Sequence, residues 1–255
     1  MAPESGPLTR TLNGIARRGG DDRHLATQIC HAYVHCLDVS GAAISVLTAT
    51  TSRQTLAATD PTATTLEDLQ FTLGEGVCID AATSGRPVTV LDIHDHLLTT
   101  RWPIFAAAVS EHTPARALLA LPLQLGTINL GVLDLYRTTP GPLRGHDLRD
   151  ALAAADAATL MLLTAPAHTC DTATLSSGDG SGWDETGWDE LGWDGSGIDR
   201  AEIHQATGMI LAQLDVPAQD AFVRLRAHAF AAHRPLAHVA RDVVARRLVF
   251  TPDMD

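Results

Sequence analysis

A sharp change of composition at residues 166–197 divides this chain into two parts that fold separately. The stretch contains an imperfect five-residue repeat, Gly-Trp-Asp with two further residues, around Trp183, Trp188 and Trp193. Five residues turn a helix by about 500°, so successive tryptophans do not share a face, and three short repeats are too few for a stacked repeat fold. We predict an acidic Gly/Trp linker at 166–197; a dedicated binding motif is the alternative.

The charges are distributed unevenly along the chain. The net charge is −12, and all 18 basic residues are arginine. Residues 1–170 carry 11 arginines and 16 acids, residues 171–197 carry seven acids and no arginine, and residues 198–250 carry seven arginines and five acids. Only the last segment is basic, so we expect any polyanionic partner to bind there.

The apolar segments and the cysteines argue against a membrane protein and against a secreted disulfide-rich protein. No window approaches the roughly 18 apolar residues of a membrane span, and residues 1–20 lack the apolar stretch of a signal peptide. The four cysteines show no CxxC spacing, which argues against a zinc knuckle or a disulfide scaffold. We expect a cytoplasmic protein that does not bind membranes, with residues 1–20 disordered.

The first part of the chain predicts an α+β domain at residues 21–165. Its clearest signal is two apolar strands, 117–125 and 128–136, separated by Gly126 and Thr127 as in a tight hairpin. Apolar residues at three- and four-residue steps indicate helices, and short apolar runs set off by Gly or Pro indicate further strands. The order predicts an antiparallel sheet with flanking helices at 24–37, 101–112 and 146–163, and further strands at 42–49 and 88–93.

The last part of the chain, residues 198–250, predicts a bundle of three short helices followed by a tail at 251–255. Asp199 can cap the first helix, with Glu202 as its capping-box partner, and Pro217 and Pro235 suit the starts of the other two. We expect the bundle core to be formed by Ile203, Ala206, Ile210, Leu214, Ala221, Phe222, Leu225, Ala229, Val239, Val243 and Val244.

Candidate chemical groups are few. His31 and His35, spaced as i and i+4, and His94 with His96 could ligate a metal, but we favour a helix surface and a solvated loop. Cys78 follows a Gly-rich loop and lacks nearby positive charge in sequence, so we expect a buried cysteine near a pocket rather than a reactive thiol. The chain contains no catalytic motif. We predict no catalytic residues and no metal site, and the sequence indicates no cofactor.

Residues 21–165 resemble a GAF domain. The similarity is carried, in order, by the stretches 73–81, 84–88, 101–105, 121–125 and 130–136. The resemblance implies a small-molecule sensor or dimerisation module, with any ligand held between the sheet and its covering helices and loops. On that basis we expect a pocket lined by Cys78, Trp102, Phe105, Leu121 and Leu133.

Residues 198–250 resemble an ANTAR domain in the stretches 203–211, 220–229 and 239–244. The resemblance implies a three-helix RNA-binding module that acts in transcription antitermination, usually as a dimer, on paired stem-loops in nascent transcripts. Thr207 stands where many ANTAR sequences have Lys. Polar residues mostly off the predicted core, together with Gly208 for close approach, are the expected RNA contacts: Arg200, His204, Gln205, Gly208, Arg224, Arg226 and Arg241.

Two functional hypotheses follow. The first is a signal-responsive RNA-binding antiterminator that works as a homodimer. The second is a non-enzymatic interaction protein, a GAF dimer whose helical tail binds a protein partner. Salt separates them, because contacts between arginine and phosphate weaken steeply as salt rises, whereas apolar contacts do not.

Overall fold

A computed structural model of the chain describes residues 6–47, 53–95, 100–126, 128–166, 197–232, 234 and 236–251. The described residues form two compact units, one ending at residue 166 and the other beginning at residue 197. Each unit is described below by itself.

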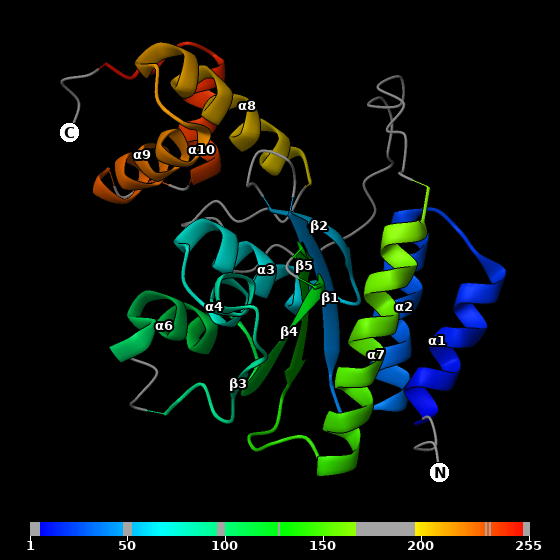
Figure 1. The fold of residues 1–255 in the computed structure, drawn as a ribbon. Coiled ribbons are helices and arrows are strands. Elements are labelled where there is room, and N and C mark those ends of the chain that lie inside the picture. The colour runs from blue at the N-terminus through cyan, green and yellow to red at the C-terminus, as the bar shows by residue number, and fades with distance from the viewer. Residues whose placement is uncertain are drawn as a thin grey trace, which may run out of the picture. The chain divides into compact units, whose positions relative to one another are not determined.

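The first unit is built on a five-stranded antiparallel sheet in the order β2–β1–β5–β4–β3 (Figure 1). The expected hairpin is confirmed as β4 and β5, and Gly126 in its turn has φ +60°, which glycine adopts without steric cost. The strands are β1 (Gly41–Leu47), β2 (Arg53–Ala58), β3 (Val88–Val90), β4 (Ala117–Leu125) and β5 (Ile128–Arg137).

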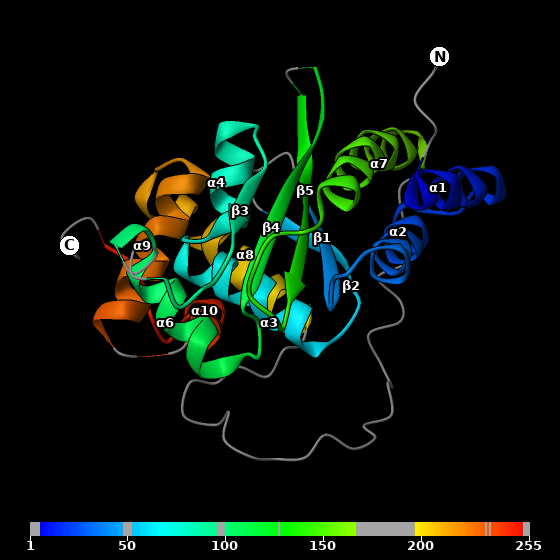
Figure 2. The ribbon, with the colours of Figure 1, turned by 90° about the horizontal axis from the view of Figure 1, so that it is seen from below.

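Two helices cover one face of the sheet, α2 (Asp22–Cys36) and α7 (Gly145–Thr164), and α1 (Pro7–Arg18) packs against both of them on the side away from the sheet (Figures 1 and 2). Side chains of this layer form one apolar core with Leu121, Leu133 and Leu135 of the sheet. Tyr33 lies fully inside this core and donates its hydroxyl to the backbone oxygen of Ala151 at 2.9 Å, so its polar end is satisfied.

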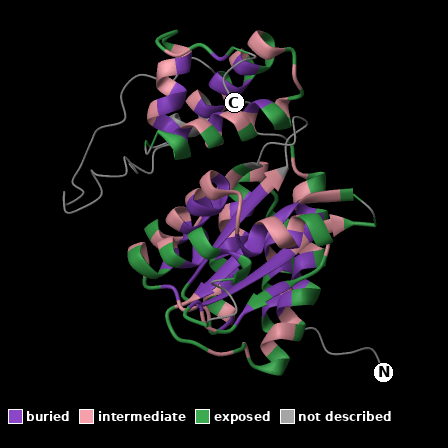
Figure 3. Ribbon diagram, turned by 90° about the vertical axis from the view of Figure 1, so that its left-hand side faces the viewer, coloured by how far each residue is buried: buried purple, intermediate pink, exposed green. Residues whose placement is uncertain are grey.

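Three further helices cover the opposite face: α3 (Pro61–Leu73), α4 (Val77–Ser84) and α6 (Pro103–His112). Proline occupies a first-turn position of α3 and of α6, where its missing N–H costs nothing. The sheet is thus buried on both faces (Figure 3). The predicted α+β architecture, an antiparallel sheet with flanking helices, is confirmed.

The N-terminal segment departs from the expectation. Residues 1–20 were predicted to be disordered, but Pro7–Arg18 form α1, with Leu8, Leu12 and Ile15 buried. The Asp150 carboxylate on α7 accepts from the backbone N–H of Leu8 at 2.9 Å and so caps α1. This partner lies more than 140 residues away in sequence, which is why the local pattern of residues 1–20 did not reveal the helix.

Besides α1, three further elements of the first unit were not predicted: β2, α3 and α4. The Gly-rich segment before Cys78 is a short link between α3 and α4, and Cys78 lies in the first turn of α4. Four of the 13 residues of α3 are threonine, and two of its buried residues, Glu67 and Gln70, are polar, so its apolar periodicity is weak. A single-face amphipathic pattern therefore did not reveal it.

The second unit contains α8 (Gly197–Leu214), α9 (Ala218–Ala231) and α10 (Leu236–Val244). Three helices are confirmed, and most of the expected core is buried, although Leu214, Phe222 and Val244 are only partly buried. Asp199 lies within α8 rather than at its cap, and Glu202 pairs with Arg241 of α10 instead of serving a capping box. Pro217 precedes α9 as expected.

Some expected features lie outside the described residues: the tryptophan repeats, nearly all of the 166–197 linker, the 252–255 end of the tail, and Pro235. Within the part of the chain that the structure describes, no helix has the length and apolar character needed to cross a membrane.

Candidate functional site

A small cavity lies in the first unit between the sheet and the helices α3, α4 and α6. Its lining is mostly apolar and includes Leu66, Phe105, Leu118 and Tyr136, with Gln70 and Asp134 as polar members. The cavity leaves about 10 Å³ for the centres of water-sized molecules, which is room for about one water. In this conformation it does not admit an organic ligand.

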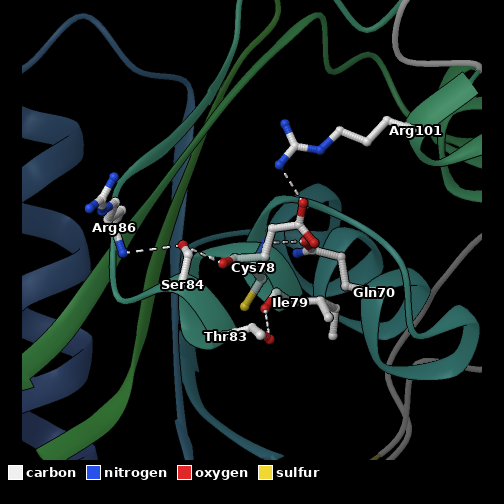
Figure 4. Close-up of polar contacts among 8 residues, drawn as sticks. Gln70, Cys78, Ile79, Thr83, Ser84, Arg86 and Arg101 are labelled. Atoms are coloured by element: carbon white, nitrogen blue, oxygen red, sulfur yellow. Dashed lines mark hydrogen bonds and ion pairs between the residues drawn. The ribbon is translucent and has the colours of Figure 1, made fainter. Parts of the chain in front are cut away.

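The segment between α3 and α4 shapes one wall of this cavity. Gly74 ends α3 at φ +67° and Gly76 precedes α4 at φ +124°, both conformations that favour glycine. A Cβ on Gly76 would lie 2.6 Å from the Gln70 amide oxygen, so the position has no room for a side chain. That oxygen accepts from the backbone N–H of Cys78 at 2.7 Å, which fixes the start of α4 against α3 (Figure 4).

The same segment holds α6. The Glu75 carboxylate accepts from the backbone N–H groups of Ile104 and Phe105 at 3.2 and 3.1 Å, and so caps the N-terminus of α6. Arg101 pairs with Asp80 of α4 at 2.6 Å (Figure 4) and stacks over Trp102 at 4.5 Å. Cap, ion pair and stacking together fix α6 against the α3–α4 segment.

A second buried feature of this unit is polar. Ser45 of β1, Glu67 of α3, Cys78 of α4 and Asp134 of β5 are all buried beside one another on the α3–α4 face. Ser45 donates to Glu67 through its hydroxyl. Burial raises the pKa of the nearby Cys30 thiol, and the negative charge of Glu67 raises it further. Two carboxyl groups and a thiol thus lie together inside the unit.

In the second unit, α9 presents a line of aromatic and cationic side chains at four-residue steps. The Arg226 guanidinium lies 4.7 Å from the centre of the Phe222 ring, a cation–π contact. Phe230, one turn further, is 71% exposed, which is unusual for a phenylalanine. Burial lowers the pKa of Arg226, but an arginine starts so far above neutral that it stays charged. We call Phe222, Arg226 and Phe230 the α9 stripe.

Two family models match this chain. Residues 21–162, more than half of its length, match the model of the GAF domain, and residues 199–244 match the model of the ANTAR domain. The chain belongs to the GAF-domain family. Its helical unit is an ANTAR domain, and since GAF and ANTAR domains are both regulatory, the protein is a regulator.

Solved structures with a similar fold include other GAF domains. The GAF domain of a phosphoenolpyruvate-protein phosphotransferase from Coxiella burnetii is 11% identical, with 61% of this chain and 90% of that chain covered and a TM-score of 0.49. Free methionine-R-sulfoxide reductase from Neisseria meningitidis, solved with its substrate, is 13% identical, with 61% and 86% covered and a TM-score of 0.47. Comparison with curated proteins gave no match.

The five residues expected to line the GAF pocket lie on both faces of the sheet. Trp102 and Phe105 of the α6 region and Cys78 of α4 lie on the face that holds the cavity, and of these Phe105 lines it directly. Leu121 and Leu133 pair across β4 and β5 but belong to the core beneath α2 and α7. Strand residues alternate between faces, so the neighbours of these leucines, Asp134 among them, face the cavity instead.

The expected RNA contacts of the ANTAR domain also separate into groups. Arg241 donates from Nε to Glu202 at 2.8 Å, an ion pair between α10 and α8. Arg224 and Arg226 are partly exposed on α9, whereas the side chain of Arg200 lies outside the described part of the chain. The α9 stripe adds Phe230, which was not predicted from the sequence. The four-residue spacing between Phe230 and Arg226, which places both on one face of a helix, could have indicated it.

The α8 candidates lie together on a more open surface. Gln205 and Gly208 are exposed, His204 is partly exposed, and a Cβ on Gly208 would meet no described atom within 4 Å. Gly208 is therefore not a site of close helix packing among the described residues of this domain. Thr207 is buried and donates to the backbone oxygen of Ile203 at 2.7 Å, so this position faces the bundle interior.

Three of the four histidines considered as metal ligands lie on the surface. His31 and His35 are exposed on α2, and His94 is exposed in the loop after β3, whereas His96 lies outside the described residues. These positions fit the preferred interpretation of a helix surface and a solvated loop.

Proposed function

We propose that this protein is a signal-responsive, RNA-binding transcription antiterminator. The observation that carries the proposal is the joining of a GAF domain and an ANTAR domain in one chain. The ANTAR domain would bind paired RNA stem-loops in nascent transcripts, and the GAF domain would sense a small molecule or mediate dimerisation. A protein acting on nascent transcripts works in the cytoplasm, and we assign it no enzymatic activity.

The α9 stripe supports RNA binding by this ANTAR domain. Proteins that read RNA loops stack unpaired bases on aromatic rings or arginine planes, and they gain affinity from arginine contacts to phosphate. Phe230 offers an exposed ring, and Arg226, already stacked on Phe222, offers a preorganised planar cation. We include Arg224 and the α8 residues His204, Gln205 and Gly208 in the proposed interface.

We infer a homodimer as the working form, so that two ANTAR domains hold two hairpins and prevent a terminator from forming. Exposed leucines on α7 support dimerisation through the GAF domain: Leu152, Leu160 and Leu163 are 38%, 51% and 41% exposed on one side of that helix. A signal that alters the GAF domain or its dimer contacts would reposition the two ANTAR domains.

One observation favours the alternative, a tail that binds a protein. The helical unit exposes several apolar side chains besides Phe230, namely Leu211, Val223 and Val249. Exposed apolar groups of this kind occur at protein interfaces. The two functions differ in their dependence on salt, so one titration separates them.

The test is a fluorescence titration of the full chain against RNAs that carry two tandem hairpins with small loops, over a range of salt concentrations. We expect selective binding that weakens as salt rises. The double variant Arg224→Ala/Arg226→Ala should bind weakly. The slope of its log affinity against log salt should be shallower by about one for each phosphate that the variant no longer binds.

The double variant Arg144→Ala/Arg149→Ala is the matched control, because it removes two exposed arginines from the GAF domain and should bind RNA as the parent does. The same titration with RNAs that carry a single hairpin shows whether tight binding needs two hairpins. If the folded protein shows no preference over bulk RNA across a library of loop sequences, the antiterminator proposal fails and the protein-binding tail replaces it.

A further inference from the structure

The buried polar cluster of the GAF domain brings three metal-binding side chains together. Ligand atoms of Glu67, Cys78 and Asp134 all lie within 4.8 Å of one another. They come from α3, α4 and β5, and their residues are 4%, 0% and 8% exposed. No sequence motif joins them, since they are separated by 11 and 56 positions in the chain.

The Glu67 carboxylate is only partly satisfied by its surroundings. Its Oε2 accepts from Ser45 and, at 3.5 Å, from Thr55. Its Oε1 is buried and has no hydrogen-bond partner among the described residues. Glu67 is also absent from the ion pairs that the described residues form. Burying a carboxylate oxygen that has no hydrogen-bond partner costs free energy. A cation bound to this oxygen would therefore stabilise the folded domain.

We propose that Glu67, Cys78 and Asp134 bind a single zinc ion. A thiolate with two carboxylates suits Zn²⁺, whereas Mg²⁺ and Ca²⁺ take oxygen ligands only. The Cys78 thiol gives its proton to solvent when its sulfur bonds to the metal. Zinc bonds of about 2.0–2.3 Å require the three groups to draw closer by small side-chain movements.

The size of the neighbouring cavity favours an ion over an organic cation. Asp134 also lines that cavity, whose free space holds about one water. An organic amine would need α6 to move away, whereas a metal ion and one water ligand need no such opening. Zinc would join α3 and α4 to β5 beside the cavity.

This site departs from the expectation of no metal drawn from sequence, and it is independent of the proposed RNA binding. Its role would be to stabilise the GAF domain by linking two of its covering helices to the sheet. Failure of either proposal leaves the other standing, because the metal site is tested without RNA.

Cobalt(II) is the probe, because a cobalt–thiolate bond gives a charge-transfer absorption that histidine or carboxylate ligands do not. The full chain, carrying Cys170→Ser so that this cysteine cannot contribute, is titrated with Co²⁺ and then with Zn²⁺. We expect the thiolate band to saturate at one cobalt per chain and to vanish as zinc displaces cobalt. Zinc should also raise the thermal unfolding temperature.

Three variants locate the site, and two others serve as controls. Cys78→Ser should lose the thiolate band, and Glu67→Gln and Asp134→Asn, which keep side-chain shape, should each weaken cobalt binding about tenfold or more. Cys30→Ser and Cys36→Ser are matched controls, since each removes a cysteine outside the cluster and should keep the band. Circular dichroism of each metal-free variant shows whether it folds.

The proposal is overturned if the folded parent gives no thiolate band, or if the band survives Cys78→Ser. It is equally overturned if Glu67→Gln and Asp134→Asn both bind cobalt as tightly as the parent. Should Cys78→Ser fail to fold, the two isosteric variants decide the question.

Discussion

Single side chains position the two candidate sites. In the GAF domain, Gln70 and Glu75 satisfy backbone N–H groups at the starts of α4 and α6, and so place the helices that cover the cavity. In the ANTAR domain, the Arg226 guanidinium stacks on the Phe222 ring, which restricts the motion of the arginine side chain. These contacts therefore fix the positions of α4 and α6 in one domain and the orientation of Arg226 in the other.

Asp242 predicts an acid-sensitive contribution to stability. It accepts from Arg234 and Arg247 at 2.6 and 2.7 Å, and these hydrogen bonds hold the pKa of its carboxyl below the usual 3.8. A lowered folded pKa means that the contribution is complete above the unfolded pKa and disappears as the pH falls through the folded one. Asp242→Asn should therefore lower the melting temperature near neutral pH, with a penalty that shrinks below about pH 4.

The measurement is thermal unfolding of the full chain and the variant from neutral to acidic pH. Asp220→Asn, which removes an exposed carboxylate from α9 of the same domain, is the matched control and should show a smaller change. A penalty for Asp242→Asn that stays constant into acid would contradict the role given to these ion pairs.

At the scale of elements, distant partners decide which segments fold. Helix α1 is amphipathic, with Leu8, Leu12 and Ile15 on one side, but it is too short to be stable alone in water. It folds because those side chains join the core with α2 and α7, and because Asp150 caps its first turn. The helix is an integral part of the GAF domain, although it lies before residues 21–162 that match the family model.

Leu12→Ala tests the contribution of α1. Leu12 is completely buried in the core, so truncation should lower the free energy of unfolding of the GAF domain by about 2–5 kcal/mol. Chemical denaturation of the full chain, followed by circular dichroism, measures the change. Asn13→Ala, at an exposed position one residue away, should have little effect. Equal effects of the two substitutions would show that α1 is not packed in solution.

At the scale of the whole molecule, the chain joins a sensor-type domain to a domain of an RNA-binding family through the acidic segment expected at 166–197. A dimer that binds two hairpins at once has a higher affinity than one bound to a single hairpin only if the segment allows both ANTAR domains to reach their sites. In the proposed dimer, the length of a polar, Gly-rich linker would set that reach, whereas the surface of each ANTAR domain would set its affinity for one hairpin.

Deleting residues 181–195 tests this division of roles. The shortened chain should bind a single hairpin with unchanged affinity, because α8 to α10 are retained. It should tolerate a narrower range of spacings between tandem hairpins, and its effect on transcription read-through should change. Gel-shift titrations over a series of hairpin spacings, with a read-through reporter, measure both. Loss of single-hairpin binding, or an unchanged spacing range, would contradict the prediction.

Local patterns in the sequence determined much of this architecture. Two apolar runs separated by a glycine turn placed the β4–β5 hairpin to within one residue, and helical patterns placed α2, α6 and α7. These signals succeed because each is local: the two strands are apolar along most of their length, and each helix repeats its buried side chains every three or four residues. Short sequence motifs also predicted that the first part of the chain is a GAF domain and the last part an ANTAR domain, and the family models confirm both.

Only the tertiary structure decided which residues share a site. The face of the sheet on which Leu121 and Leu133 lie depends on strand register, which moved them away from Cys78 and Phe105. The meeting of Glu67, Cys78 and Asp134 depends on how α3 and α4 pack on β5. The fold of α1 depends on a carboxylate in α7. Each of these outcomes is a contact between residues distant in sequence, and local periodicity carries no information about such contacts.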